Sequence, residues 1–84
     1  MLRLRDNVSI AESEDNVVLL DERAGEYFQL NPSGALALRT LLDGGTPDQA
    51  VRALTEQFDV DGERAGKDVM ALVADLRAAG LVIS

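Results

Sequence analysis

The sequence predicts an α+β, winged-helix-like fold, in which an N-terminal three-stranded antiparallel β-sheet is followed by three α-helices. Up to residue 30, short runs rich in Val, Leu and aromatic residues are separated by turn residues. From residue 31 onwards, apolar residues recur at helical spacing in three segments, each preceded by a capping residue. A chain of 84 residues has room for one hydrophobic core, so we expect a single domain over residues 1–84.

Three short apolar runs are predicted to form the sheet: residues 8–12, 16–21 and 26–30. Apolar and polar residues alternate in the first, Val and Leu dominate the second, and the third carries two aromatic residues. Glu14 and Asp15 mark the first turn. Residues 21–25 have the length of a hairpin loop, and Gly25 suits the positive φ that such loops need. These short connections predict an antiparallel meander.

The first predicted helix begins after Asn31 and ends before Gly44. Asn31 can cap this helix, and Pro32 suits the first helical position, where its missing N–H leaves no hydrogen bond unmade. The apolar residues at helical spacing are Ala35, Leu36, Leu38, Leu41 and Leu42. Gly44 and Gly45 then interrupt the pattern, which predicts that the helix ends there in a flexible connection.

The second and third predicted helices also follow capping residues. Thr46 and Gln49 have the spacing of a capping box, in which each side chain bonds to the other residue's backbone N–H. The apolar face of this second helix comprises Ala50, Val51, Leu54 and Phe58. Asp61 can cap the third helix, which Gly80 ends. The apolar stripe of the third helix comprises Ala65, Val69, Leu72, Val73 and Leu76. Residues 81–83 are expected to pack back onto the core.

The composition argues against catalysis. The chain contains no Cys, His or Trp, so it lacks thiol nucleophiles, imidazole bases and the commonest metal ligands. A Ser or Asp nucleophile needs a nearby base or metal to activate it, and the sequence offers none. We therefore expect a binding protein rather than an enzyme, without a metal or other cofactor.

Charge and hydropathy narrow the range of partners and locations. The formal net charge is −7 at pH 7, which repels a polyanion such as DNA. The longest apolar stretches fall far short of the ~20 residues that a membrane-spanning helix needs. The first residues lack the continuous apolar middle of a secretory signal. We expect a cytoplasmic protein that binds neither nucleic acid nor membranes.

The predicted strand at residues 26–30 is a candidate binding surface. In a simple meander it is an edge strand, and it carries no Pro, Lys or bulge that would block a guest strand. Its residues are Glu26, Tyr27, Phe28, Gln29 and Leu30. Apolar strand residues more often only build the core. The residues by themselves therefore leave two interpretations open: an edge that accepts a guest strand, or a core strand whose edge a loop covers.

The third predicted helix is the other candidate surface. One flank of its apolar stripe comprises Arg64, Asp68, Ala71 and Asp75. Charged residues beside a core stripe usually form no more than a solvated helix face. Ala71 is small, however, and would let another chain approach closely between its charged neighbours. This flank is therefore the predicted wall of a groove.

Two other functions fit parts of the sequence. An acyl carrier protein needs a Ser at a helix start to bear phosphopantetheine, and Ser33 is the best candidate. It stands in Asn-Pro-Ser-Gly, however, rather than in the Asp-Ser-Leu of such carriers. A winged-helix DNA-binding regulator would contact DNA through Arg64, Lys67 and Arg77 of the third helix. That helix carries as many acids as bases, which leaves little capacity to neutralise phosphates.

The segments 18–34 and 75–82 resemble the PqqD family. The pattern consists of Leu-Leu-Asp at 19–21, Gly-Glu-Tyr at 25–27, Leu-Asn at 30–31 and then Gly34. The family is named for a pyrroloquinoline quinone biosynthesis protein and includes the recognition elements of many ribosomally made, modified peptides. As a free-standing form without Cys, the chain looks most like the discrete leader-binding proteins of lasso peptide biosynthesis.

The resemblance implies that the chain binds the leader segment of a precursor peptide. Family members add the leader as a fourth antiparallel strand, in a groove completed by the third helix. By position, the implied peptide-binding residues are Glu26, Tyr27, Phe28, Gln29, Leu30, Arg64, Asp68, Ala71, Leu72 and Asp75. The module would deliver the precursor to a leader protease, and a cyclase is the second candidate recipient. The open edge also predicts a monomer or a weak dimer that pairs through this strand.

Overall fold

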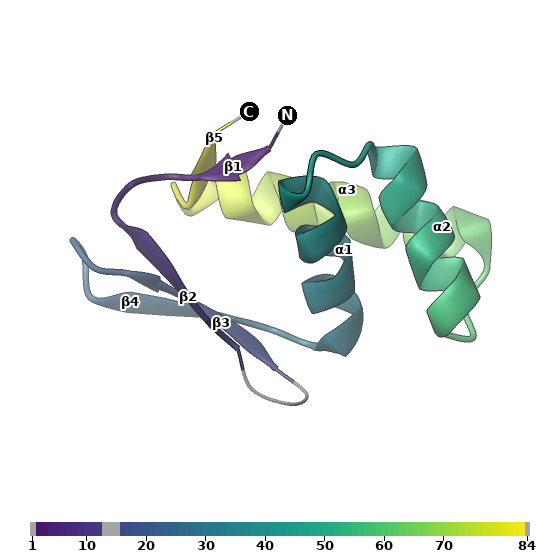
Figure 1. The fold of residues 1–84 in the computed structure, drawn as a ribbon, viewed down its shortest axis with the longest axis horizontal. Coiled ribbons are helices and arrows are strands. Elements are labelled where there is room, and N and C mark those ends of the chain that lie inside the picture. The colour runs from purple at the N-terminus through teal and green to yellow at the C-terminus, as the bar shows by residue number, and fades with distance from the viewer. Residues whose placement is uncertain (1, 13–15, 84) are drawn as a thin grey trace.

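The computed structural model describes residues 2–12 and 16–83, and its helices lie on one side of a small sheet (Figure 1). In chain order the elements are β1 (Arg3–Leu4), β2 (Val8–Glu12), β3 (Val17–Asp21), β4 (Glu26–Leu30), α1 (Pro32–Leu42), α2 (Pro47–Gln57), α3 (Gly62–Ala78) and β5 (Val82–Ile83). The sheet β2–β3–β4 precedes the three helices, which confirms the predicted fold class. The predicted turn at Glu14 and Asp15 lies outside the described residues.

β2, β3 and β4 form the predicted antiparallel meander, with β3 in the middle. Leu19 of β3 lies opposite Phe28 of β4, and residues directly opposite one another share a face of the sheet. Leu19 is fully buried, so this face packs toward the helices. The other face carries Leu20 opposite Tyr27, and Tyr27 is 75% exposed. The core therefore lies on one side of the sheet only.

Asp21 holds the turn between β3 and β4. Gly25 has a φ of 71°, as the sequence predicts for this loop. Asp21 Oδ1 accepts hydrogen bonds from Asn7 Nδ2 at 2.8 Å and from the backbone N–H groups of Arg23 and Ala24, both at 3.1 Å. These bonds, that of Asn7 foremost, lower the pKa of the Asp21 carboxyl because they stabilise its charged form. The carboxylate thus joins the turn to the segment before β2.

We expect the stability that the Asp21 charge contributes to disappear in acid. Because its pKa is lower in the folded chain than the unfolded value of about 3.9, the contribution is complete well above that value. It is lost as the pH falls through the folded pKa. The melting temperatures of wild type and Asp21→Asn should therefore differ most near neutral pH and converge in acid. Asp59→Asn, at an exposed site, controls for the change in net charge. A difference in melting temperature between wild type and Asp21→Asn that stays the same at every pH would contradict this account.

All three helices begin at the predicted caps. The side chains of Asn31, Thr46 and Asp61 accept a hydrogen bond from the backbone N–H three residues later, at 2.8, 3.1 and 2.8 Å. The Gln49 side chain accepts the Thr46 N–H at 2.8 Å, which completes the capping box. The sequence placed Phe58 on the apolar face of the second helix, and this prediction was wrong. Phe58 lies one residue beyond α2, in an extended conformation. Its N–H still donates to the Leu54 carbonyl at 2.9 Å, but its φ of −125° and ψ of 149° end the helix, and its side chain packs against the core from there.

Glycines follow the first and third helices, as predicted, with φ values of 92° at Gly44 and 72° at Gly80. After α3, the Leu81 N–H donates to the Leu76 carbonyl and the Gly80 N–H donates to the Arg77 carbonyl, both at 3.0 Å. This pair of bonds is a Schellman cap. Leu76 and Leu81 are both buried, so the cap turns the tail onto the core. The predicted packing of residues 81–83 is confirmed.

The sequence does not predict the pairing of β1 with β5. Arg3 lies opposite Ile83 and Leu4 opposite Val82, so the two ends of the chain lie side by side (Figure 1). Each strand has two residues, which is too short to show an alternating pattern. The ladder holds both ends of the chain against the core.

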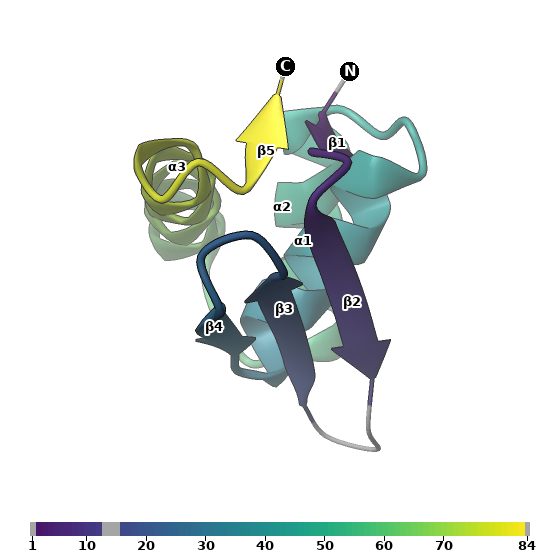
Figure 2. The same cartoon turned by 90° about the vertical axis from the view of Figure 1, so that its left-hand side faces the viewer.

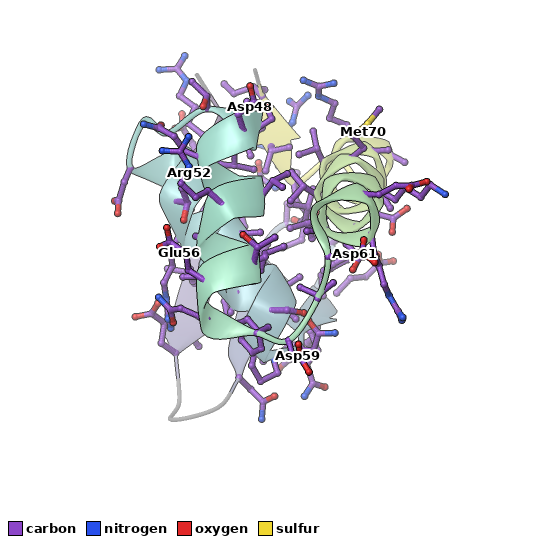
Figure 3. All side chains as sticks on the ribbon, turned by 90° about the vertical axis from the view of Figure 1, so that its right-hand side faces the viewer. Asp48, Arg52, Glu56, Asp59, Asp61 and Met70 are labelled. Carbon is purple, nitrogen blue, oxygen red and sulfur yellow. The ribbon has the colours of Figure 1, made fainter. Side chains whose placement is uncertain are left out.

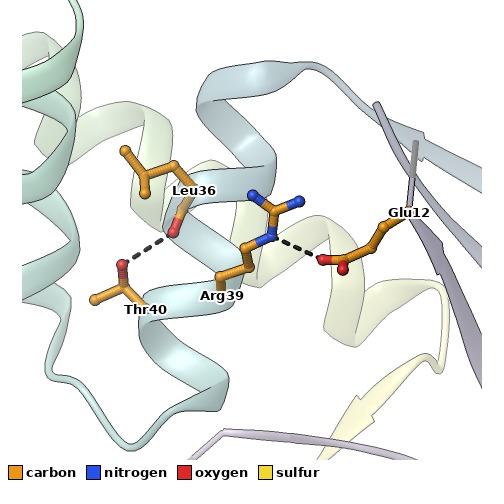
Figure 4. Close-up of polar contacts among 4 residues, drawn as sticks. All are labelled: Glu12, Leu36, Arg39 and Thr40. Atoms are coloured by element: carbon orange, nitrogen blue, oxygen red, sulfur yellow. Dashed lines mark hydrogen bonds and ion pairs between the residues drawn. The ribbon is translucent and has the colours of Figure 1, made fainter. Parts of the chain in front are cut away.

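α1 is attached to the sheet by an ion pair as well as by apolar packing (Figure 4). Arg39 Nε lies 2.8 Å from Glu12 Oε1 of β2, and the two side chains are 48% and 50% exposed. Such a pair contributes only ~0–1 kcal/mol. Leu38 and Leu41 on the same helix are buried, so apolar packing supplies most of the attachment.

Candidate functional site

β4 lies at the edge of the sheet, as predicted. Within residues 2–12 and 16–83 it pairs with β3 alone, because β3 separates it from β2. The N–H and C=O groups that point away from β3 are therefore available to a further strand. The strand contains no Pro and no Lys, the residues that commonly protect such edges.

A groove of about 480 Å³ runs along this edge, and α3 forms its other wall. Figure 2 looks along α3 and shows the helix next to β4. β4 contributes the consecutive residues 28–30. Since neighbouring side chains of a strand point to opposite faces, three consecutive lining residues mean that the strand's own edge forms this wall. The groove thus combines a backbone edge with a helix surface.

The structure brings most of the predicted site residues together at this groove. Those that line it are Phe28, Gln29, Leu30, Arg64, Asp68, Ala71, Leu72 and Asp75. Glu26 and Tyr27 do not line it. Tyr27 faces the other side of the sheet with Leu20, and Glu26 is the first residue of the strand. Their backbone still belongs to the open edge, so their part in strand pairing stays a prediction.

Five further lining residues have no place in the sequence-based prediction: Asn31, Ser33, Gly34, Ala37 and Leu54. The first three lie where β4 passes into α1. Because they directly follow the strand in the sequence, their place in the groove could have been predicted. Ser33 Oγ donates to Asn31 Oδ1 at 3.1 Å, so this hydroxyl belongs to the helix cap. Ala37 and Leu54 reach the groove through the packing of α1 and α2, which no local pattern reveals.

The floor of the groove is apolar. Leu30, Ala37 and Leu54 are buried, while Phe28 and Leu72 are partly buried and pack against the core. A guest side chain that enters the groove transfers apolar surface out of water, which stabilises a complex by roughly 25 cal/mol per Å². The groove is therefore suited to an extended segment with apolar side chains at alternate positions.

The rim of the groove is charged. Arg64, Asp68 and Asp75 are exposed, and none of them has an ion-pair partner in the part of the chain that the structure describes. Elsewhere on α3, Lys67 Nζ lies 3.7 Å from Glu63 Oε1. That contact offsets part of the positive charge that a DNA-binding helix would need.

The described residues contain no group of three or more His, Cys, Asp or Glu side chains that could hold a metal ion. Across the same residues, every helix is too short or too polar to span a bilayer.

Known proteins share both the sequence pattern and the fold. The family model described as coenzyme PQQ synthesis protein D (PqqD) matches residues 16–82. A structure described as lasso peptide synthetase B1 complexed with the leader peptide has a TM-score of 0.90 and 40% identity, over 99% of this chain and 98% of that one. A second, TbiB1 in complex with the TbiA(beta) leader peptide, has a TM-score of 0.84 and 29% identity, over 95% and 93%. No match was found among curated proteins. The resemblance seen in the sequence is confirmed.

Proposed function

Because the chain belongs to the PqqD family, we propose that it binds the leader segment of a ribosomally made precursor peptide in lasso peptide biosynthesis. The leader joins the sheet as a fourth strand beside β4 and lies against α3. The observation that carries this proposal is the open edge of β4, which forms one wall of an apolar groove. Both similar solved structures are complexes with a leader peptide.

The two walls of the groove have different tasks. Backbone groups of β4 pair with the backbone of the guest whatever its sequence is, so the strand supplies general affinity. The pockets between Phe28, Leu54 and Leu72 accept alternate guest side chains, so they supply specificity. Truncation of an apolar guest side chain should therefore weaken binding more than removal of an exposed charge.

The module acts by delivery rather than by catalysis, and it needs no cofactor. A leader protease that binds the loaded module meets the precursor at an effective concentration in the millimolar range when the connecting segment fits. The cyclase is the second recipient that we propose for the precursor. Capture thereby raises the rate of processing although no residue of this chain takes part in the chemistry.

A titration with a synthetic leader peptide tests the proposal. The probe is the leader segment of any short precursor peptide found in the neighbouring open reading frames, and a scrambled peptide of the same composition is the control. At 100 times the Kd, binding stabilises the fold by about 2.7 kcal/mol. For a domain of this size we expect the melting temperature to rise by roughly 10–20 °C. If the leader shifts the melting temperature no more than the scrambled peptide does, the proposal fails.

The open edge of β4 also predicts self-association in the absence of leader. Two copies can pair through this strand, because each offers the same unpaired backbone groups. Sedimentation at high protein concentration should show a weak dimer that dissociates when leader is added. A monomer under both conditions would show that the edge does not pair with itself.

A further inference from the structure

The outward face of α3 is apolar along the second half of the helix. Met70, Ala74 and Ala78 recur at every fourth residue, so they form one row on the helix surface. All three are exposed, and Met70, which is 73% exposed, projects outward from α3 in Figure 3. Nearer the start of the helix, Lys67 and Glu63 pair with each other at 3.7 Å. A solvated helix face normally carries charged residues throughout, so the row is a face that the rest of the described chain leaves uncovered.

A hollow of about 340 Å³ lies beside this row, between α3, Leu2 and the loop that joins α1 to α2. From α3 it is lined by Val73 and Arg77. These residues stand two positions after Ala71 and Asp75, which line the groove. Two positions are about 160° apart around a helix, so the hollow and the groove lie on opposite flanks of α3.

The loop presents bare backbone to this hollow. Gly44 has a φ of 92°, a conformation that residues with side chains rarely adopt. A Cβ atom at Gly45 would lie 2.6 Å from the Thr40 carbonyl oxygen, which is closer than such atoms approach in proteins. Neither glycine accepts a side chain without strain. The hollow is therefore open to a side chain from another molecule.

The charges around the hollow suit a single carboxylate rather than an acidic run. Arg77 is the only charged residue that lines it, and across the part of the chain that the structure describes its guanidinium forms no ion pair. Arg3 of β1 adds a positive charge nearby. Asp43 and Asp48, at the two ends of the loop, are exposed and offset these two bases. A guest therefore gains from one acidic group placed on Arg77, and further acidic groups meet the two aspartates.

We propose that the rear flank of α3, which comprises Met70, Val73, Ala74, Arg77 and Ala78, binds a helix of a partner protein. That helix places a large apolar side chain in the hollow and one carboxylate on Arg77. The small side chains of Ala74 and Ala78 let a second helix lie close to α3, where Met70 packs against it. Met and Arg are both enriched at protein interfaces. Because the groove lies on the opposite flank, the partner and a guest in the groove are bound at the same time, which goes beyond the proposed function.

A second copy of the chain suits this flank less well than another protein does. Each copy carries a net charge of −7, so two copies repel each other. The row from Met70 to Ala78 is about 12 Å long, whereas a stable interface buries about 800 Å² on each partner. A different protein supplies the remaining area with contacts beyond α3.

A phage-displayed library of helical peptides tests this inference on the whole chain. Peptides are selected on wild type, and each is then assigned to a surface with two variants that add the same side chain. A peptide bound to the rear flank should lose about tenfold or more in affinity with Ala74→Arg and stay within about twofold with Ala71→Arg. A peptide bound in the groove should show the reverse. Arg is nearly as good a helix former as Ala, so both variants should stay folded.

The sequences of the peptides bound to the rear flank test the role of Arg77. We expect a large apolar residue with Asp or Glu three or four positions away, on the same face of the peptide helix. Arg77→Glu should weaken these peptides about two- to fivefold, and replacement of the peptide's acidic residue by Lys should restore the affinity. Arg52→Glu, on the outer side of α2, makes the same change in net charge and should leave binding unchanged (Figure 3).

Three results would overturn the inference. The first is that no selected peptide responds to Ala74→Arg. The second is that peptides sensitive to Ala74→Arg do not respond to the charge reversal at Arg77. The third is a dimer of the free chain, seen by sedimentation, that Ala74→Arg dissociates and Ala71→Arg does not, because the flank would then bind a second copy. None of these results bears on leader binding, which a titration with leader peptide measures separately.

Discussion

Ala71→Arg is expected to reduce the affinity for the leader by about 30-fold or more, which corresponds to ~2 kcal/mol. Ala71 is exposed on α3 and lines the groove opposite the edge of β4. A long charged side chain at this position occupies the space of the guest strand. Arg is nearly as good a helix former as Ala, so the fold should be retained. The measurement is a titration with labelled leader peptide, accompanied by a melting curve of the free protein.

Ala74→Arg is the matched control for this substitution. Ala74 is exposed on the same helix but lines no part of the groove. It receives the same side chain and the same charge, so its affinity for the leader should stay within about twofold of wild type. Equal losses at both positions would show that charge or helix stability, rather than occupation of the groove, explains the result.

Leu72→Asp is expected to have a comparable effect for a different reason. Leu72 is partly buried, lines the groove and packs against the core, so its side chain supplies apolar surface to the guest. A carboxylate there removes this surface and must lose part of its hydration when a guest strand covers it. We expect affinity to fall by about 30-fold, together with some loss of stability.

Val73→Asp distinguishes the loss of binding from the loss of stability. Val73 is the next residue on α3 and is also partly buried against the core, but it lines a separate cavity of about 340 Å³. Both variants should melt at lower temperatures than wild type, and only Leu72→Asp should lose affinity when titrated well below its melting temperature. If Leu72→Asp stays folded and binds like wild type, Leu72 does not belong to the site.

Local signals in the sequence account for most of the fold. Asn31, Thr46 and Asp61 predict the three helix starts because each cap depends only on the residues that follow it closely. Gly25 and Gly80 predict turns for a similar reason, since both require a positive φ. The β1–β5 ladder was not predictable, because it joins two-residue strands from opposite ends of the chain.

The candidate site was predictable where it depends on periodicity. The α3 wall follows from the helical spacing of Arg64, Asp68 and Asp75, and all three line the groove. The contribution of Leu54 was not predictable, because it depends on how α2 packs beside α3. The position of Tyr27 was also predictable. Side chains alternate between the two faces of a strand, so Tyr27 and Phe28 cannot both face the helices, and Tyr27 lies with Leu20 on the outer face.

The most direct measurement for the proposed function is amide hydrogen exchange of residues 26–30, with and without leader peptide. Among those residues, the N–H groups that point away from β3 should exchange rapidly in the free protein and slow strongly when the leader is added. The N–H groups that already pair with β3 should change much less. If the outward-pointing groups are protected in the free protein and unaffected by saturating leader, β4 is not the strand to which the leader is added.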